Sequence, residues 1–137
     1  ASRTIVRRPI HARGCAMTRV YGPTDNRARG GTVAFNVVSR SGSVVPYQQV
    51  ERAALECGVS IRGGCFCNPG AAERAFGFPA AETAACMERA RRDGFSVEKF
   101  AECLGGAVAV GAVRASVGIA TNEADIARLI GVVKRMQ

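Results

Sequence analysis

Residues 32–39 read TVAFNVVS, a run rich in β-branched and aromatic side chains that predicts a β-strand. Ser41 and Gly42 follow it and predict a turn. We expect a helix next, from Pro46 to Cys57, with Gly58 placed to end it. Its apolar residues recur at the i, i+3, i+4, i+7 spacing of one helix face: Val50, Ala53, Ala54 and Cys57.

The rest of the chain continues this alternation of strands and helices. A short strand is predicted at 59–62, followed by helices at 69–76, 80–92 and 96–104. Residues 112–117 alternate apolar and polar side chains, which predicts a strand with one buried face. Asn122 and Asp125 resemble a capping box that opens the last helix. This order of elements predicts an α+β fold, with helices packed on a small sheet.

Composition limits the class of protein. The 137 residues suit one domain with its own core, and 47% of them are hydrophobic. The net charge is +8, but the basic residues are scattered and aromatics make up only 6%, which argues against nucleic-acid binding. No run approaches the roughly 18 apolar residues of a membrane span, and the sequence shows no secretory signal. We therefore expect a soluble, cytoplasmic protein with no membrane partner.

Residues 62–70 read RGGCFCNPG and place two cysteines on a glycine-rich turn, directly before a helix that Asn68 and Pro69 open. Unpaired N–H groups and the positive end of the helix dipole favour an anion there. The thiol of Cys67, the nearer one to the helix, is therefore expected to be acidic and nucleophilic, and Arg62 adds positive potential. The same residues also fit a tight turn with two buried cysteines, and the spacing alone does not choose between these interpretations.

A metal site is another interpretation of the two cysteines. Cys65 and Cys67 could supply two thiolates, but structural zinc takes four ligands, usually in pairs. The single histidine, His11, has no partner at such a spacing, so we expect no metal site. Most of the other cysteines are expected to be small buried hydrophobic side chains: Cys15, Cys57, Cys86 and Cys103.

Three segments resemble a known enzyme family. Residues 62–70 resemble the cysteine-bearing loop of molybdenum cofactor sulfurases, R-T-G-C-F-C-N-x-G-A-C, and the R-x-G-x-x-C loop of cysteine desulfurases within the class V aminotransferases. Residues 20–36, with YGP and then RGGTVAFN, resemble the stretch that opens the small C-terminal domain of that family. Residues 111–126, with GAVRAS and then NEADI, are similar to its V-R-x-S…N-x-x-E-[IV]-D-x-L ending. The segments lie in the family's order over nearly the whole chain.

The resemblance implies a fold and a site. The fold would be a small, mainly antiparallel sheet with helices packed on it, as in the small domain of fold-type I pyridoxal-phosphate enzymes, with 1–19 as a connecting segment and 20–137 as the domain. The family's loop cysteine takes the sulfur of a cysteine substrate as a persulfide; Cys67 matches it, and Cys65 is a candidate secondary thiol. Arg114 matches the arginine that binds the substrate carboxylate, and Arg62 is a second candidate. Without this match, Arg114 would be interpreted as a solvent-facing strand residue.

The implied cofactor is pyridoxal phosphate, which the family binds through a lysine of a large domain preceding this region. Lys99 and Lys134 match no such motif and are expected to be surface residues, so this chain alone is not expected to bind the cofactor or to desulfurate cysteine. The implied partners are the large domain, L-cysteine, the molybdenum cofactor as sulfur acceptor, and a second copy of the complete enzyme in a homodimer.

Departures from the family pattern leave alternatives. Gly63 stands where the loop usually has threonine, and Ala72 stands where many sulfurases have another cysteine. Cys65 and Phe66 replace the paired histidines of many desulfurases, which favours the sulfurase branch. One alternative is a class V aminotransferase-type domain without sulfur transfer, in which Arg114 keeps its role. The other is a stand-alone, non-catalytic sulfur carrier.

Overall fold

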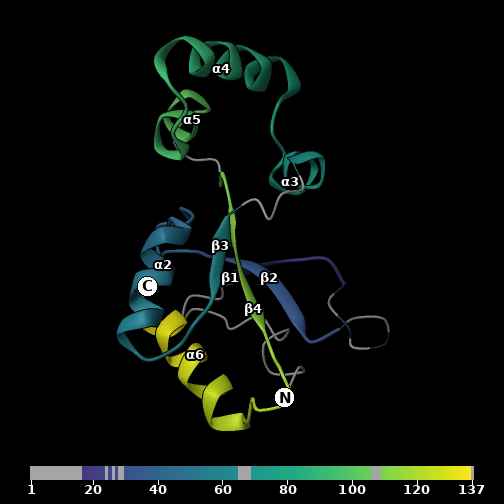
Figure 1. Ribbon diagram of the computed structural model, residues 1–137, viewed down its shortest axis with the longest axis vertical. Coiled ribbons are helices and arrows are strands. Elements are labelled where there is room, and N and C mark those ends of the chain that lie inside the picture. The colour runs from purple at the N-terminus through teal and green to yellow at the C-terminus, as the bar shows by residue number, and fades with distance from the viewer. Residues whose placement is uncertain are drawn as a thin grey trace. The chain divides into compact units, whose positions relative to one another are not determined.

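A computed structural model describes residues 17–23, 25, 27, 30–64, 69–105 and 109–136. These residues form two compact units: one combines the residues up to Gly64 with those from Ala112 onward, and the other contains the residues between them. The described elements are four antiparallel strands and five helices, which confirms the predicted α+β class (Figure 1).

The first unit contains the sheet. Its strands are β1 (Thr18–Tyr21), β2 (Thr32–Val37), β3 (Arg62–Gly64) and β4 (Ala112–Ser116). Their order is β1-β2-β4-β3, and each neighbouring pair is antiparallel. Strand β3, the shortest, therefore lies at one edge of the sheet.

Helices α2 (Tyr47–Glu56) and α6 (Glu123–Arg135) pack on one face of this sheet and against each other (Figure 1). The core of the unit lies where they meet the strands. Its buried side chains are almost all β-branched or aromatic residues of the strands and aliphatic residues of the helices: Val20, Val33, Phe35, Val37, Val50, Val113, Ala115, Leu129 and Val133. Side chains that alternate with these along the strands face away from the two helices.

The glycine that ends α2 and the capping residues that begin α6 are those that the sequence predicts. Gly58, at φ +67°, follows α2. Its N–H donates to the carbonyl of Leu55 at 2.9 Å, and the N–H of Val59 donates to the carbonyl of Ala54 at 2.9 Å. This is the Schellman arrangement, in which glycine adopts the left-handed conformation at low cost. Helix α6 begins with a complete capping box between Asn122 and Asp125.

The second unit is helical. It consists of α3 (Pro69–Phe76), α4 (Ala80–Asp93) and α5 (Val97–Cys103). Its small core contains Cys86, Phe100, Leu104 and Val110. Among the described helices of both units, none is long and apolar enough to cross a membrane.

The structure corrects the expectation for the cysteines. Cys86 and Cys103 form a disulfide, with their Cα atoms 5.8 Å apart. Cys57 is a free thiol and only half-buried, whereas Cys15 lies outside the described residues. Two cysteines 17 residues apart pair only if α4 and α5 are folded against each other, and the sequence does not show this.

Two strands also differ from the prediction. Strand β1 is not among the predicted strands, since Gly22 and Pro23, which directly follow Tyr21, are typical of a turn. The strand predicted at 59–62 is observed as β3, at Arg62–Gly64. It begins later because the N–H of Val59 still bonds to the end of α2. The proposed domain limits, 1–19 and 20–137, stay a prediction.

Candidate functional site

The two arginines predicted to bind substrate lie directly opposite each other on neighbouring strands. Arg62 of β3 pairs in register with Arg114 of β4. Directly opposed residues of an antiparallel pair point to the same face, with Cβ atoms about 5 Å apart. Arg114 is half-buried and Arg62 is exposed, so Arg62 is the more solvent-accessible of the two. Sequence positions 52 residues apart are thus brought to one place.

Both arginines lie on the face of the sheet away from α2 and α6. Val113 and Ala115, on either side of Arg114, are buried in the core against those helices. The alternation of a strand then places Arg114 on the opposite face. The register continues this row across the sheet, from Arg62 through Arg114 and Ala34 to Tyr21.

Tyr21 ends this row on β1, and its phenol has an altered acidity. Burial raises the pKa of Tyr21 above its usual value near 10, because removal from water disfavours the anion. The charge of Arg19 and its hydrogen bond act in the opposite direction but only partly offset burial. The phenol is therefore neutral at physiological pH.

Helix α2 holds β3 from the side of the core. The backbone N–H of Gly63, the residue after Arg62, donates a hydrogen bond to Glu51 Oε1 at 2.6 Å. A Cβ atom on residue 63 would overlap the ring of Tyr47 and lie 3.1 Å from Glu51 Cδ. Tyr47 and Glu51 are four residues apart, so they lie on the same face of α2. This packing explains why glycine occupies the position where the sulfurase loop usually has threonine.

The cysteines of the motif, Cys65 and Cys67, lie outside the described residues, as does Asn68. The structure describes the elements on either side of these residues, β3 and α3. Strand β3 ends at Gly64, two residues later than predicted, and helix α3 begins at Pro69, where it was predicted to begin. Along the chain, Cys67 therefore follows Arg62 by five residues and precedes α3 by two.

Metal binding was the other interpretation of the two motif cysteines. The described residues contain no group of three or more His, Cys, Asp or Glu side chains arranged to bind a metal ion. Cys65 and Cys67 lie outside the described residues, and the expectation that they bind no metal stays a prediction.

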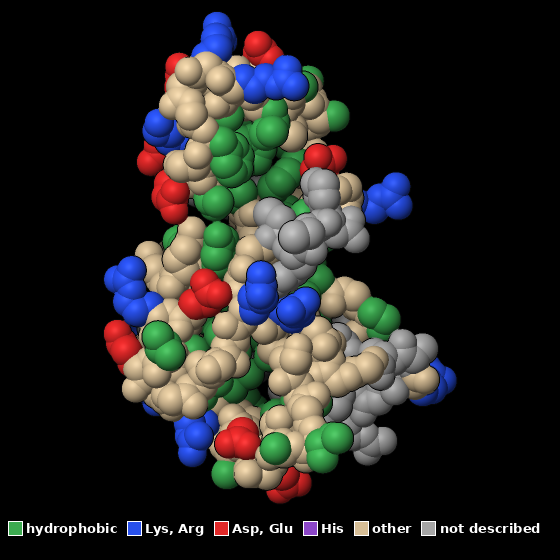
Figure 2. Space-filling model, in the orientation of Figure 1, with side chains coloured by type: hydrophobic (Ala, Val, Ile, Leu, Met, Phe, Trp, Pro, Cys, Tyr) green, Lys and Arg blue, Asp and Glu red, His purple; other side chains and the backbone are tan. Residues whose placement is uncertain are grey.

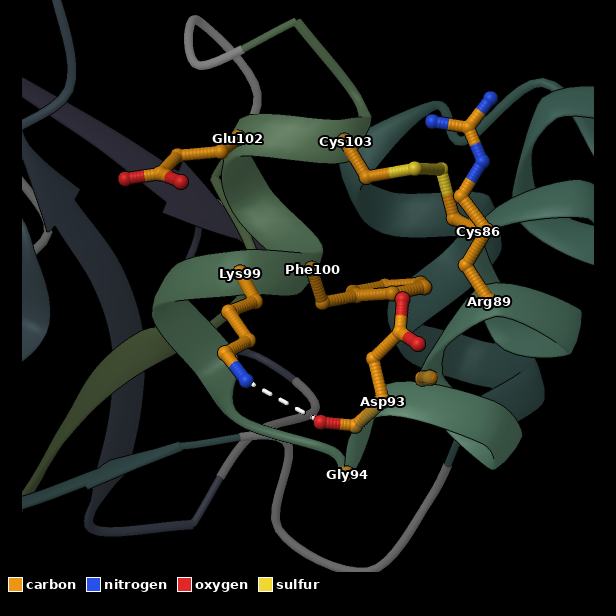
Figure 3. A pocket seen from close by; sticks show the side chains of 9 residues that line it. Cys86, Arg89, Asp93, Gly94, Lys99, Phe100, Glu102 and Cys103 are labelled. Atoms are coloured by element: carbon orange, nitrogen blue, oxygen red, sulfur yellow. Dashed lines mark hydrogen bonds between the residues drawn. A yellow bond between two sulfur atoms is a disulfide. The ribbon is translucent and has the colours of Figure 1, made fainter.

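A cavity of about 380 Å³ lies in the second unit, between α4 and α5. The Cys86–Cys103 disulfide, Phe100 and the backbone of Gly94 line it (Figure 3). Lys99 Nζ donates to the carbonyl of Asp93 at 3.1 Å at its rim. The residues that line it do not include Arg62 or Arg114.

The surface charge of the described residues is mixed. On the face shown in Figure 2, Lys and Arg side chains are spread over the molecule with acidic side chains among them. On this face, the basic side chains of the described residues are not gathered into one patch.

Comparison with known proteins identifies relatives along most of the chain. A molybdenum cofactor sulfurase of Anopheles gambiae is 33% identical over 128 residues, which cover 91% of this chain. That of Drosophila melanogaster is 33% identical over 123 residues (88% of the chain), and molybdenum cofactor sulfurase 2 of Culex quinquefasciatus is 31% identical over 128 residues (91%). The chain is homologous to a segment of molybdenum cofactor sulfurases.

The resemblance stated from the three motifs is thereby confirmed. The chain spans only 15% to 16% of the length of these sulfurases, and the match supports a sulfurase-like domain. No protein-family model matches the chain.

Two residues near the arginines were not predicted from the sequence, namely Tyr47 and Glu51. Their one sequence signal is their position: Tyr47 and Glu51 continue the i, i+4, i+7 row that ends at Ala54 of the buried stripe of α2. Glu51 is half-buried, and a half-buried carboxylate on a core-facing helix needs a donor. The identity of that donor, the Gly63 N–H, depends on tertiary contact and is not visible in the sequence.

Proposed function

We propose that this chain is the part of a sulfurase-like enzyme that carries sulfur on Cys67 and binds the substrate carboxylate through Arg114 and Arg62. The observation that supports this most directly is the register of β3 and β4. It sets the two arginines side by side at the point where the chain enters the segment with Cys65 and Cys67.

An anion between the arginines is physically reasonable. Like charges directly opposite each other on neighbouring strands destabilise a sheet, and a carboxylate bound between them would offset that repulsion. A guanidinium offers parallel N–H donors that match the two oxygens of a carboxylate. The half-buried Arg114 would act as the fixed member of the pair, and the exposed Arg62 as the mobile one.

The sulfur-transfer step conserves atoms and electrons. The thiol of Cys67 gains the sulfur of L-cysteine and becomes a persulfide, so one S–S bond forms. The Cβ–S bond of L-cysteine breaks, and its carbon skeleton takes up a hydrogen and leaves as alanine. Cys67 is a suitable acceptor because a thiol just before a helix N-terminus is more acidic, hence a better nucleophile.

The described residues do not fit a site for pyridoxal phosphate. Lys99 is exposed on α5 and its Nζ bonds to the Asp93 carbonyl, and Lys134 is exposed in the last turn of α6. The cofactor would therefore belong to a large domain of the complete enzyme, as would the contacts of a homodimer. The sulfur acceptor we propose is the molybdenum cofactor, after which the homologous enzymes are named.

The decisive experiment follows sulfur on Cys67 in the complete enzyme. With L-cysteine as substrate, mass spectrometry of the peptide that contains residue 67 should show the added mass of one sulfur atom. Cys67→Ala should abolish transfer, because it removes the proposed sulfur-carrying thiol, whereas Cys57→Ala, which removes a thiol outside the motif, should keep it. Full transfer by Cys67→Ala would refute the carrier role. Turnover of an amino acid without any persulfide would favour the aminotransferase-type alternative.

The arginine pair has its own test. Removing Arg114 should raise the KM for L-cysteine about 10- to 100-fold, because a hydrogen-bonded charge pair contributes about 1.5–3 kcal/mol. Arg114→Lys should restore only part of the loss, since a lysine cannot bind both oxygens in the same way. Arg52→Ala, which removes an exposed arginine from α2, is the matched control. An unchanged KM in Arg114→Ala would exclude Arg114 from the substrate site.

A further inference from the structure

We propose that Glu51 and Tyr47 are positioning residues for the sulfur-carrying segment, and this inference rests on the proposed function of Cys67. They would hold β3 so that Arg62 stays opposite Arg114 and residues 65–68 leave the sheet from a fixed point. Neither residue belongs to any of the three motifs that carry the resemblance to sulfurases.

The hydrogen bond from Gly63 to Glu51 is the first basis of this inference. β3 has only three residues and one neighbouring strand, β4, so few sheet contacts hold it. The Gly63 N–H lies 2.6 Å from Glu51 Oε1, and a hydrogen bond to a charged acceptor is about twice as strong as a neutral one. Glu51 is itself fixed, because α2 packs against β2, β3, β4 and α6.

The Tyr47 ring is the second basis. It packs against the core of the first unit and occupies the space that a side chain at position 63 would need. The contact with Gly63 therefore fixes the distance between α2 and β3, while the Glu51 bond fixes the rotation of the strand. Both contacts act on Gly63, which lies one residue after Arg62 and two residues before Cys65.

The position of β3 matters for both parts of the proposed reaction. Arg62 lies one residue before Gly63, so a shift of β3 would move one arginine away from the other. Cys67 lies four residues after Gly63, so the same shift would change where its thiol can reach. A misplacement of about 1 Å at a reacting group can lower a rate about 100-fold.

The first experiment compares Glu51→Ala, Glu51→Gln and Glu56→Ala in the complete enzyme. Glu51→Ala should lower the rate of persulfide formation on Cys67 about tenfold, because the Gly63 N–H loses its acceptor. Glu51→Gln keeps an acceptor oxygen and should recover most of the rate. Glu56 is exposed on the same helix, so Glu56→Ala should change the rate less than about twofold.

A second measurement on the same variants separates positioning from loss of folding. The amide of Gly63 should exchange its hydrogen faster in Glu51→Ala, while amides of β2 keep their protection. The inference is wrong if Glu51→Ala behaves like Glu56→Ala, or if its rate falls only in proportion to the folded fraction. If instead Cys67→Ala retains full transfer, the proposed function fails first, independently of Glu51.

The Tyr47 contact is tested by a double-mutant cycle. Gly63→Ala should slow persulfide formation, because its Cβ overlaps the Tyr47 ring. Combining it with Tyr47→Ala removes the overlap, so the double variant should be about fivefold or more faster than the product of the two single effects predicts. Effects that simply multiply would show that Tyr47 does not set the position of β3.

Discussion

At the scale of single residues, Tyr21 shows how burial changes the chemistry of one side chain. The folded protein holds its phenol at a raised pKa, whereas the unfolded chain releases the proton near pH 10. The resulting contribution to stability is complete below the unfolded pKa and is lost as the pH rises through the folded pKa. Tyr21→Phe removes this titration.

Urea unfolding from about pH 8 to about pH 11 checks this prediction. The free energy of unfolding should fall less steeply with pH in Tyr21→Phe than in the unchanged protein. The chain has only two tyrosines and no tryptophan, so the tyrosinate absorbance can be assigned by comparing Tyr21→Phe with Tyr47→Phe. Identical pH dependence in Tyr21→Phe and the unchanged protein would show that the folded state does not hold this proton.

The sequence identified Arg62 and Arg114 as separate candidates but did not show that they meet. Which residues oppose each other depends on strand register, and here the register joins strands separated by a 47-residue insertion that forms three helices. The Cys86–Cys103 bond was missed for the same reason, since it depends on how two helices fold together. The reactivity of Cys67 stays a prediction from its local sequence.

At the scale of elements, the start of α6 has the clearest local cause. The side chain of Asn122 accepts hydrogen bonds from the N–H groups of Ala124 at 2.8 Å and Asp125 at 3.2 Å. The Asp125 carboxylate accepts one from the N–H of Asn122 at 3.1 Å. Asn122→Ala removes the first part of this box and should lower the free energy of unfolding by about 1 kcal/mol.

Chemical denaturation of Asn122→Ala and Asn122→Asp tests the cap. The aspartate variant keeps an acceptor oxygen and should be nearly as stable as the unchanged protein. A loss of equal size in both variants would mean that the amide group of Asn122, rather than its acceptor oxygen, supports the helix.

Helix ends could be predicted within one or two residues because their signals are local. Ser96 before α5 and Gly58 after α2 each act on backbone groups a few residues away. The strands were less well predicted. Strand β1 exists through its pairing with β2, in which Val20 stands opposite Phe35. Its four residues are too few to show a strand pattern in the sequence alone.

At the scale of the whole molecule, the chain divides into a unit with a sheet and a helical unit, and each has its own core. The core of the helical unit is small, so the Cys86–Cys103 disulfide contributes a large share of its stability. A disulfide that closes a loop of this length stabilises a protein by about 3 kcal/mol, chiefly by restricting the unfolded chain.

Hydrogen exchange before and after reduction tests this division. Reduction, or Cys103→Ser, should accelerate exchange in α4 and α5. Amides of β2 and β4 should keep their protection, because neither Cys86 nor Cys103 belongs to their unit. Equal loss of protection in both units would show that they unfold as one cooperative body.

The hydrogen bond between Gly63 and Glu51 has a consequence for association between molecules. An edge strand offers its unpaired N–H and C=O groups to extended segments of other chains, and such pairing often begins aggregation. Here a carboxylate of the same molecule already accepts from the central N–H of β3. It also places a negative charge where an added strand would have to lie, so the sheet resists strand addition at its β3 edge.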